Sequence, residues 1–238
     1  MAIQNLKSLI TERYPYAEVK RKKVDGKRYY EGQNKLLPSV TTILSASKSE
    51  EDKKGLDAWR NRVGEETAEA IRNQAASIGT AVHKFLECTI KGVGYDDITN
   101  NGVIGKRMAK VIIDKAFSSI DEFWGTEVAL YYPTLYGGTT DCVGVWNGRP
   151  AIMDFKQTNK PKKAEWIEDY FIQLAAYSMA HDALFGTKME VGVILMVSRA
   201  LEYQLFTIDG QRMDDYKYKW LKRCEKYYGE MGNERISR

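Results

Sequence analysis

One apolar segment carries two charged residues at alternate positions. The stretch "AIMDFKQT" (151–158) reads as a strand and contains Asp154 and Lys156. Side chains two residues apart on a strand point to the same face, so the carboxylate and the amine should lie side by side. The alternative is an exposed ion pair on the wet side of a sheet, and the preceding segment helps to choose between the two.

That preceding segment places a second carboxylate opposite Asp154. Asn147-Gly148 separates two alternating runs, and this dipeptide is a strong signal for a two-residue hairpin turn. Such a turn pairs residues whose numbers sum to 295, so Asp141 should face Asp154 with Cβ atoms roughly 5 Å apart. Pro150 lacks a backbone donor and can shift this register by one residue.

Two carboxylates at this separation repel each other unless a cation lies between them. Carboxylate oxygens suit Mg²⁺ or Mn²⁺, and one or two such ions would activate water toward a phosphate. Asp141 and Asp154 are therefore predicted metal ligands. Lys156 is predicted to be catalytic, because it can hold the water or stabilise developing charge. Chance acids on a solvated strand are the alternative interpretation.

Two helical pairs can support this site. His83 and Glu87 lie four residues apart after Gly79-Thr80 and project from one side of a helix. His83 can be a further metal ligand, and Thr80 can approach a phosphate; a surface His–Glu pair is the alternative. Glu127, at the start of a strand, is either a supporting residue or an ordinary exposed acid.

The second pair follows the strand that carries Lys156. Gln173 and Tyr177 also lie four residues apart on one helical face. Gln173 can orient Lys156 or a nucleotide, and Tyr177 can brace the site. A helix face with one aromatic residue packed on a sheet is the alternative.

The pattern of apolar and turn residues predicts an α/β chain with a helical N-terminal portion. A basic hairpin turns at Asp25-Gly26, and a helix capped by Ser39 or Thr41 follows. The expected helices cover 49–75, the stripe at 78, 82, 85, 86 and 90, 103–123, the segment ending at Gly186, and the C-terminus. The expected strands cover 126–132, 139–146, 150–157, 190–197 and 202–208.

The composition is that of an ordinary globular protein. The 238 residues carry a net charge of +4, which alone does not indicate a polyanionic partner. The three cysteines are scattered and should be free thiols, too few for an iron–sulfur cluster. We expect no membrane segment and no targeting peptide, and hence a cytoplasmic protein of a bacterial or phage-infected cell.

Five motifs occur in a fixed order: "GTAVHKFLE", a strand from Glu127, "GGTTD", "IMDFK" and "QLAAY". Together they resemble the RecB-like branch of the PD-(D/E)XK nuclease superfamily. The earlier segments "LPSVTTIL" and "LDAWRNRVGEE" narrow the resemblance to the group containing the mitochondrial genome maintenance exonucleases and their phage relatives.

The resemblance implies a restriction-endonuclease-like fold, a central mixed β-sheet flanked by helices. It implies that Asp141, Asp154 and His83 bind Mg²⁺ or Mn²⁺ and that Lys156 is catalytic, with Gln173 and Tyr177 in a further motif. We expect a single nuclease domain over 1–238. Residues 1–76 would form a basic, helical DNA-guiding portion that arches over the site, and 77–238 the nuclease core.

DNA contacts are expected from hydroxyl and basic side chains near this core. The alternatives are helix capping for the hydroxyls and a solvated charge run for the hairpin. Basic residues beside tyrosines fit phosphate binding with base stacking. The predicted DNA-binding residues are Lys22, Lys23, Ser39, Thr41, Thr42, Thr80, Lys160, Lys162 and Lys163.

The leading functional hypothesis is a metal-dependent DNA exonuclease that prefers single-stranded ends, in replication, recombination or degradation. An endonuclease of the same fold on duplex or branched DNA is the first alternative. A catalytically silent DNA-binding protein and a small-molecule phosphohydrolase are the others. The sequence leaves open the polarity of digestion, DNA versus RNA preference, processivity, oligomeric state and protein partners.

Overall fold

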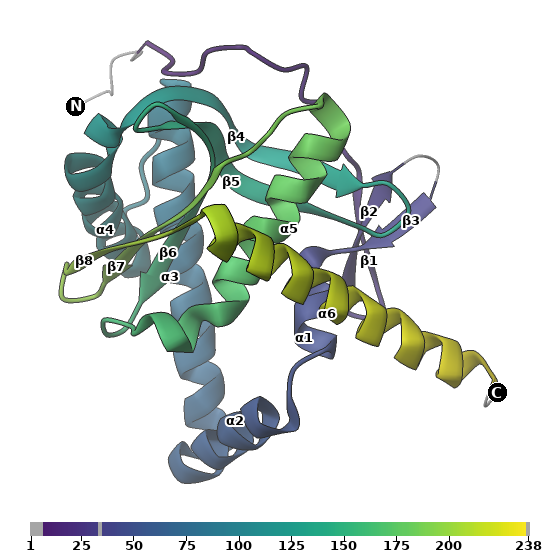
Figure 1. Ribbon diagram of the computed structural model, residues 1–238. Coiled ribbons are helices and arrows are strands. Elements are labelled where there is room, and N and C mark those ends of the chain that lie inside the picture. The colour runs from purple at the N-terminus through teal and green to yellow at the C-terminus, as the bar shows by residue number, and fades with distance from the viewer. Residues whose placement is uncertain (1–6, 33–34, 237–238) are drawn as a thin grey trace.

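The computed structural model describes residues 7–32 and 35–236 (Figure 1). Its centre is a five-stranded mixed sheet of order β4-β5-β6-β7-β8, in which only β6 and β7 are parallel neighbours among the described strands. The strands are β4 (Ile120–Tyr132), β5 (Tyr136–Trp146), β6 (Arg149–Thr158), β7 (Val191–Ser198) and β8 (Tyr203–Asp209). The expected mixed sheet flanked by helices is confirmed.

Helices cover both faces of this sheet (Figure 1). On β6, Met153 and Phe155 join a core with α3 (Glu65–Lys91) and α4 (Asn100–Ala116). Ile152, on the opposite face, joins a core with α5 (Glu168–Phe185) and α6 (Gly210–Ile236). Asp154 shares the face of Ile152, because strand residues alternate between faces.

The turn between β5 and β6 has the predicted register. Trp146 pairs with Arg149, and the ladder continues to Cys142 opposite Met153. Asn147 and Gly148 have φ values of 46° and 77°, as a type I′ turn requires. Pro150 lies opposite Val145 without shifting the register.

Two helix boundaries differ from the sequence-based expectation. The predicted helix over 103–123 is α4 at 100–116, and after the 3-10 turn η1 (Phe117–Ser119) the chain enters β4. Tertiary pairing decides this, because Ile120 aligns with Trp146 and the strand takes up the following residues. The helical stretch over 49–75 is broken at Gly64, whose φ of 83° ends α2 (Glu50–Val63) before α3 begins.

The N-terminal portion contains a small sheet as well as helices. Strands β1 (Arg21–Val24) and β2 (Lys27–Gly32) form the expected hairpin, and β3 (Lys35–Pro38), not expected from the sequence, pairs with β2. Helix α1 (Val40–Ala46) follows with Ser39 as its cap.

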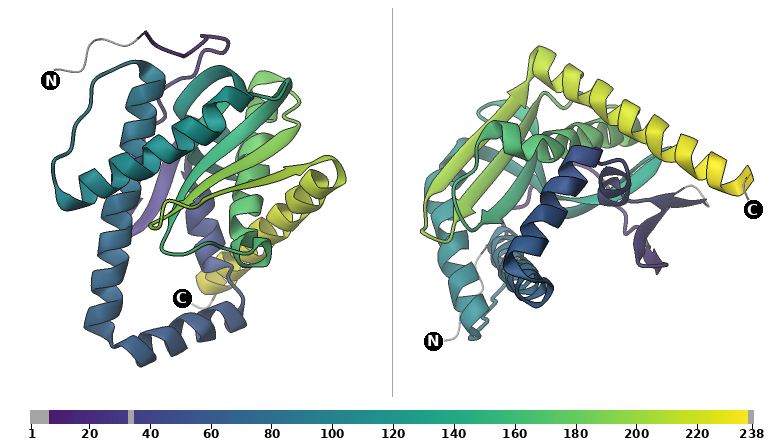
Figure 2. Two further views of the ribbon diagram at one scale, coloured as in Figure 1. Left: turned by 90° about the vertical axis from the view of Figure 1, so that its left-hand side faces the viewer. Right: turned by 90° about the horizontal axis from the view of Figure 1, so that it is seen from below.

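Helix α2 connects α1 to the far end of α3, beyond the edge of the sheet (Figure 2). Helix α3 is continuous across the predicted boundary at 76/77, so the guiding portion and the core share it. The division of the chain remains a prediction, and its first six and last two residues lie outside the described structure. No helix in the described part of the chain is long and apolar enough to span a membrane.

Candidate metal centre and active site

Asp141 and Asp154 lie where two paired strands separate. The last pair of the β5–β6 ladder is Cys142 with Met153. Asp141 and Asp154 are the next residues beyond this pair, away from the turn. The Asp141 carboxylate accepts a hydrogen bond from the backbone N–H of Phe155 across this opening, at 2.7 Å. Both aspartates are buried, with 8% and 1% of their surface exposed. Two buried acids therefore meet at a fork in the sheet.

Lys156 and Gln173 approach Asp154 from either side. The Lys156 Nζ lies 2.5 Å from Asp154 Oδ2. Asp154 Oδ2 is buried, and the Lys156 ammonium is the charged group in contact with it. Gln173 Nε2, on α5, donates to Asp154 Oδ1 at 3.5 Å. Gln173 therefore contacts the carboxylate, whereas the sequence suggested Lys156 or a nucleotide.

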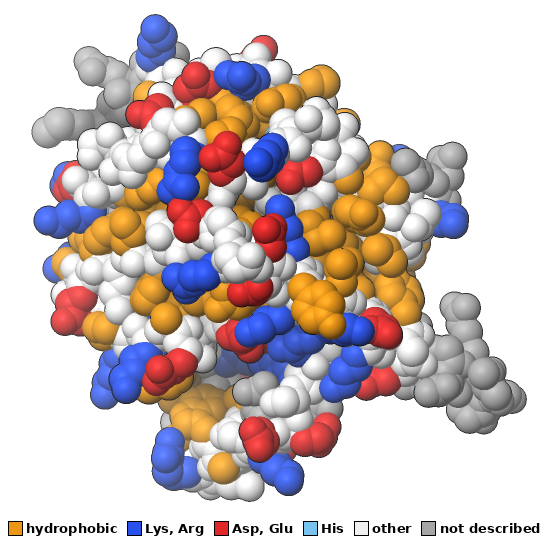
Figure 3. All heavy atoms as spheres, viewed as in Figure 1, with side chains coloured by type: hydrophobic (Ala, Val, Ile, Leu, Met, Phe, Trp, Pro, Cys, Tyr) orange, Lys and Arg blue, Asp and Glu red, His pale blue; other side chains and the backbone are white. Residues whose placement is uncertain are grey.

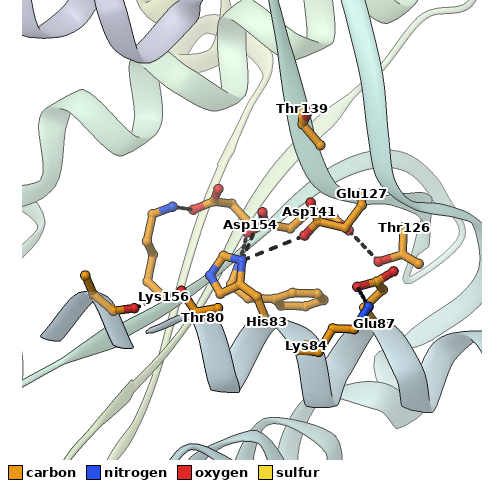
Figure 4. A network of polar contacts seen from close by, with 12 residues as sticks. Thr80, His83, Lys84, Glu87, Thr126, Glu127, Thr139, Asp141, Asp154 and Lys156 are labelled. Atoms are coloured by element: carbon orange, nitrogen blue, oxygen red, sulfur yellow. Dashed lines mark hydrogen bonds and ion pairs between the residues drawn. The ribbon is translucent and has the colours of Figure 1, made fainter. Parts of the chain in front are cut away.

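His83 reaches the same place from the other side of the sheet. Its Nδ1 lies 3.4 Å from Asp141 Oδ1 and 4.0 Å from Glu127 Oε1 (Figure 4). One ligand atom from each of His83, Glu127 and Asp141 lies within 4.8 Å of the others. Glu127 has a φ of 52°, a strained value for a residue with a Cβ. At Glu127 the backbone therefore departs from the extended conformation of a regular strand.

These residues fit a divalent cation by the chemistry of their donor atoms. An imidazole nitrogen and carboxylate oxygens form a donor set that suits Mn²⁺ or Mg²⁺. The three residues whose ligand atoms lie within 4.8 Å of one another include Glu127 and not Asp154. Asp154 as a metal ligand therefore stays a prediction.

The protonation states of these groups depend on one another. Burial opposes a positive charge on His83, but Asp141 outweighs it and raises the pKa of His83 to about 9. Burial raises the pKa of Asp141, but His83 and Lys156 lower it to about 2. For Asp154, burial outweighs the attraction of Lys156 and the pKa rises to about 7. Despite burial, Asp154 holds the pKa of Lys156 above its usual value.

Burial also affects the ionisation of Tyr177 and Glu127, the two other predicted residues beside this centre. Tyr177 is buried, and its ring packs where a Cβ on Gly138 would come within 2.6 Å. Burial raises its pKa well above the usual value, so the phenol stays neutral beside Gln173. Partial burial and nearby Asp141 also raise the pKa of Glu127.

Two predicted residues of α3 point elsewhere. Glu87 accepts from Lys84 at 2.9 Å and from Lys91 at 2.6 Å, so its carboxylate is held away from His83 (Figure 4). Thr80 is exposed, and its Oγ1 donates to the carbonyl of Ala76 at 3.0 Å.

The predicted hydroxyl residues are largely engaged within the protein. Ser39 caps α1 by accepting from the Thr42 N–H at 3.0 Å, and it is 2% exposed. Its Oγ also contacts the Thr41 and Thr42 hydroxyls, and Thr42 Oγ1 donates to the Arg28 carbonyl. The capping alternative therefore accounts for Ser39.

The predicted lysines occupy two exposed regions. Lys22 forms an ion pair with Glu31 on the β1–β2 hairpin, where Lys23 is also exposed. Beside them lies a groove of about 810 Å³ lined by Arg21, Lys22, Lys23, Gly26, Lys27, Arg28, Thr41, Thr42, Ser45 and Ala46. Lys160, Lys162 and Lys163 are exposed on the segment after β6.

Sequence reasoning missed one aromatic residue at the site. Tyr170 lies on α5, and the Lys156 Nζ is 4.9 Å from its ring centroid. Tyr170 precedes Gln173 by three residues, so helical spacing was the signal that pointed to it.

The fold and the side chains define a class of protein. Two aspartates and a lysine on adjacent strands of a mixed sheet, joined by a histidine from a flanking helix, form a candidate divalent-metal centre. Among curated proteins the chain resembles mitochondrial genome maintenance exonuclease 1. It is 24% identical to the Homo sapiens protein over 223 residues, which cover 87% of this chain and 62% of that protein.

The Mus musculus protein of the same name is 26% identical over 214 residues, covering 84% of this chain and 62% of that protein. The chain thus spans about three fifths of the length of these relatives. No family model matches it. A solved structure from Eubacterium rectale, named as a candidate exonuclease, aligns with a TM-score of 0.46 at 14% identity, covering 66% of this chain and 65% of that one.

Proposed function

We propose that this chain is a metal-dependent exonuclease that hydrolyses phosphodiester bonds at DNA ends, with a PD-(D/E)XK site. One observation carries the proposal: Asp141, Asp154, Lys156 and His83 converge at the fork between β5 and β6. Buried ion pairs add little net stability to a fold, whereas such a centre suits phosphate chemistry. The similarity to mitochondrial genome maintenance exonuclease 1 supports the same activity.

Asp141, Asp154, His83 and Glu127 would hold the ion or ions, Mg²⁺ or Mn²⁺. A divalent ion held there supplies the positive charge that makes water a competent nucleophile and neutralises the phosphate. Asp154 holds the pKa of Lys156 above its usual value, so Lys156 is an ammonium beside this carboxylate. It would orient the water or help to deprotonate it, and its charge would stabilise the phosphate.

The surrounding residues position this machinery. Gln173 holds one oxygen of Asp154, and Tyr177 packs nearby as a neutral phenol. The basic groove beside the β1–β2 hairpin would bind the phosphates of the incoming DNA. In the space-filling view, Lys and Arg side chains gather where the α2 end meets the main body (Figure 3).

The test is digestion of end-labelled linear and circular DNA, single- and double-stranded, with Mg²⁺, Mn²⁺ or EDTA. Linear single strands should disappear only with metal, and circles should survive. Lys156→Ala should lower the rate by at least 10²- to 10³-fold, the loss that follows removal of one transition-state donor. Lys110→Ala, in an exposed ion pair on α4, is the control. Cleavage of circles would indicate an endonuclease, and binding without cleavage a silent DNA-binding protein.

A further inference from the structure

Trp166, four residues before Tyr170 in the chain, exposes most of its side chain. It is 61% exposed, whereas Trp124, Trp146 and Trp220 are at most 4% exposed. Tryptophan buries large apolar area when it packs, so an indole left in solvent gains nothing for the fold. It lies in the 3-10 turn η2 (Ala164–Ile167), between β6 and α5.

The chain around Trp166 is held in place by hydrogen bonds. The side-chain amide of Gln204 accepts from the Lys162 N–H at 2.8 Å and donates to its carbonyl at 2.9 Å. Thr158 Oγ1 donates to the Lys160 carbonyl at 2.9 Å, and the Trp166 N–H donates to the Lys163 carbonyl at 3.0 Å. The exposed ring is therefore presented by a fixed segment, which lowers the entropic cost of binding.

Basic and aromatic groups alternate from Lys156 outward. Lys156 Nζ lies 4.9 Å from the centre of the Tyr170 ring. Trp166 lies four residues before Tyr170 in the chain, and Lys163 Nζ is 5.3 Å from the centre of its ring. Grooves that bind single strands combine lysines for the phosphates with aromatic rings on which bases stack. A base inside a duplex is stacked on both faces and paired, whereas an unpaired base leaves its faces free to stack on Trp166.

We propose that Trp166 is a base-stacking platform for an unpaired nucleotide next to the scissile phosphate, with Lys163 contacting the adjoining backbone. This inference rests on the proposed nuclease function and specifies its substrate class. The substrate is nucleic acid whose bases are unpaired where the DNA leaves the site. Trp166 is then a specificity-determining residue for single-stranded over duplex ends.

The test measures binding in EDTA, so that no hydrolysis occurs, by fluorescence anisotropy of an end-labelled single-stranded oligonucleotide. Trp166→Ala should weaken binding by roughly 5- to 150-fold, the range measured for one base stacked on an aromatic side chain. Trp166→Phe should retain most of the affinity. Tyr218→Ala is the matched control, because Tyr218 is a 62% exposed aromatic residue on α6 that also lies under a lysine.

A series of oligonucleotides, each with one abasic site at a different distance from the end, shows whether a base is the contact. At one position the abasic strand should bind the wild-type protein as weakly as the intact strand binds Trp166→Ala. Trp166→Ala should bind that abasic strand as tightly as it binds the intact strand. An equal loss with intact and fully abasic strands, an equal loss with Tyr218→Ala, or unchanged binding by Trp166→Ala would overturn the proposal.

These outcomes are separable from failure of the proposed function. If Trp166→Ala binds and cleaves single strands like the wild type while Lys156→Ala is inactive, the nuclease stands and the stacking role is wrong. If the wild type cleaves nothing with either metal, the nuclease proposal fails, and the metal-free binding assay still decides whether Trp166 stacks on a base.

Discussion

At the scale of single residues, the centre consists of charges that determine one another. Asp141 and His83 form an ion pair, and Lys156 lies against Asp154. Both contacts place a positively charged group against a carboxylate that is proposed to bind the cation. Binding of an ion should therefore displace protons, since ligands must be deprotonated.

The first prediction concerns the pH dependence of metal binding. Asp154 has a pKa of about 7 and His83 of about 9, so protons compete with the ion and affinity should fall as pH falls from 9 to 6. Calorimetry of Mn²⁺ binding in buffers of different ionisation enthalpy should detect proton release at pH 8. There Asp154 is already ionised, so the release comes mainly from His83.

His83→Gln should abolish most of that release at pH 8 and leave the release near pH 6 that comes from Asp154. Release at pH 8 that is unaffected by His83→Gln would show that His83 is not a ligand.

The second prediction concerns Gln173. Gln173→Leu removes the amide that holds Asp154 and should lower metal affinity or the hydrolysis rate by about 10- to 100-fold, as for other residues that orient a ligand. Gln211→Leu is the control, because Gln211 makes the same kind of bond to Asp215 on exposed α6, at 3.0 Å. Equal effects of the two changes would contradict the assignment.

At the scale of elements, the position of α3 relative to the sheet decides whether His83 reaches Asp141. Helix α4 packs closely on α3, because Gly105 has no side chain: a Cβ there would lie 2.6 Å from the Ala81 Cβ and 3.1 Å from the Val82 nitrogen. These contacts come directly before His83 in the chain.

The third prediction follows from that close approach. Gly105→Ala should push the helices apart and cost about 1–3 kcal/mol of unfolding free energy, typical of overpacking, with weaker metal binding. Gly55→Ala, in α2, adds a Cβ that would have no atom within 4 Å, so it should stabilise by about 0.5–1 kcal/mol. Chemical denaturation of both variants measures the difference, and stabilisation by Gly105→Ala would show that the packing adjusts.

At the scale of the whole molecule, charge is distributed unevenly. Acidic and basic side chains intermingle on the face that carries α5 and α6 (Figure 3), and the net charge is only +4. The basic groove at the β1–β2 hairpin is a local exception. Local rather than overall charge should therefore govern DNA affinity.

The fourth prediction tests that distribution. Lys23→Gln with Lys27→Gln should weaken single-strand binding for all sequences alike. The slope of log K against log salt should fall by about 0.7 per lost phosphate contact. Lys106→Gln with Lys110→Gln, on α4 and in exposed ion pairs, changes the net charge equally and should leave the slope nearly unchanged. Equal slopes for the two double variants would mean that the hairpin does not contact the phosphates.

The sequence alone determined the features that depend on neighbouring residues. Asn147-Gly148 set the turn and hence the register that puts Asp141 one step past Cys142, because a two-residue turn fixes every pair beyond it. Helical spacing predicted the buried stripe from Ile78 to Ile90, and Gly186 ended α5 in a left-handed conformation.

Only the tertiary structure decided which groups come together from distant segments. Spacing placed His83, the predicted metal ligand, and Glu87 on one side of a helix. Packing of α3 directs His83 to Asp141, while two lysines hold Glu87. Glu127 joins the cluster through a positive φ, and the β4 boundary depends on pairing with β5. Periodicity and turn chemistry act over a few residues, whereas these outcomes depend on contacts between segments far apart in the chain.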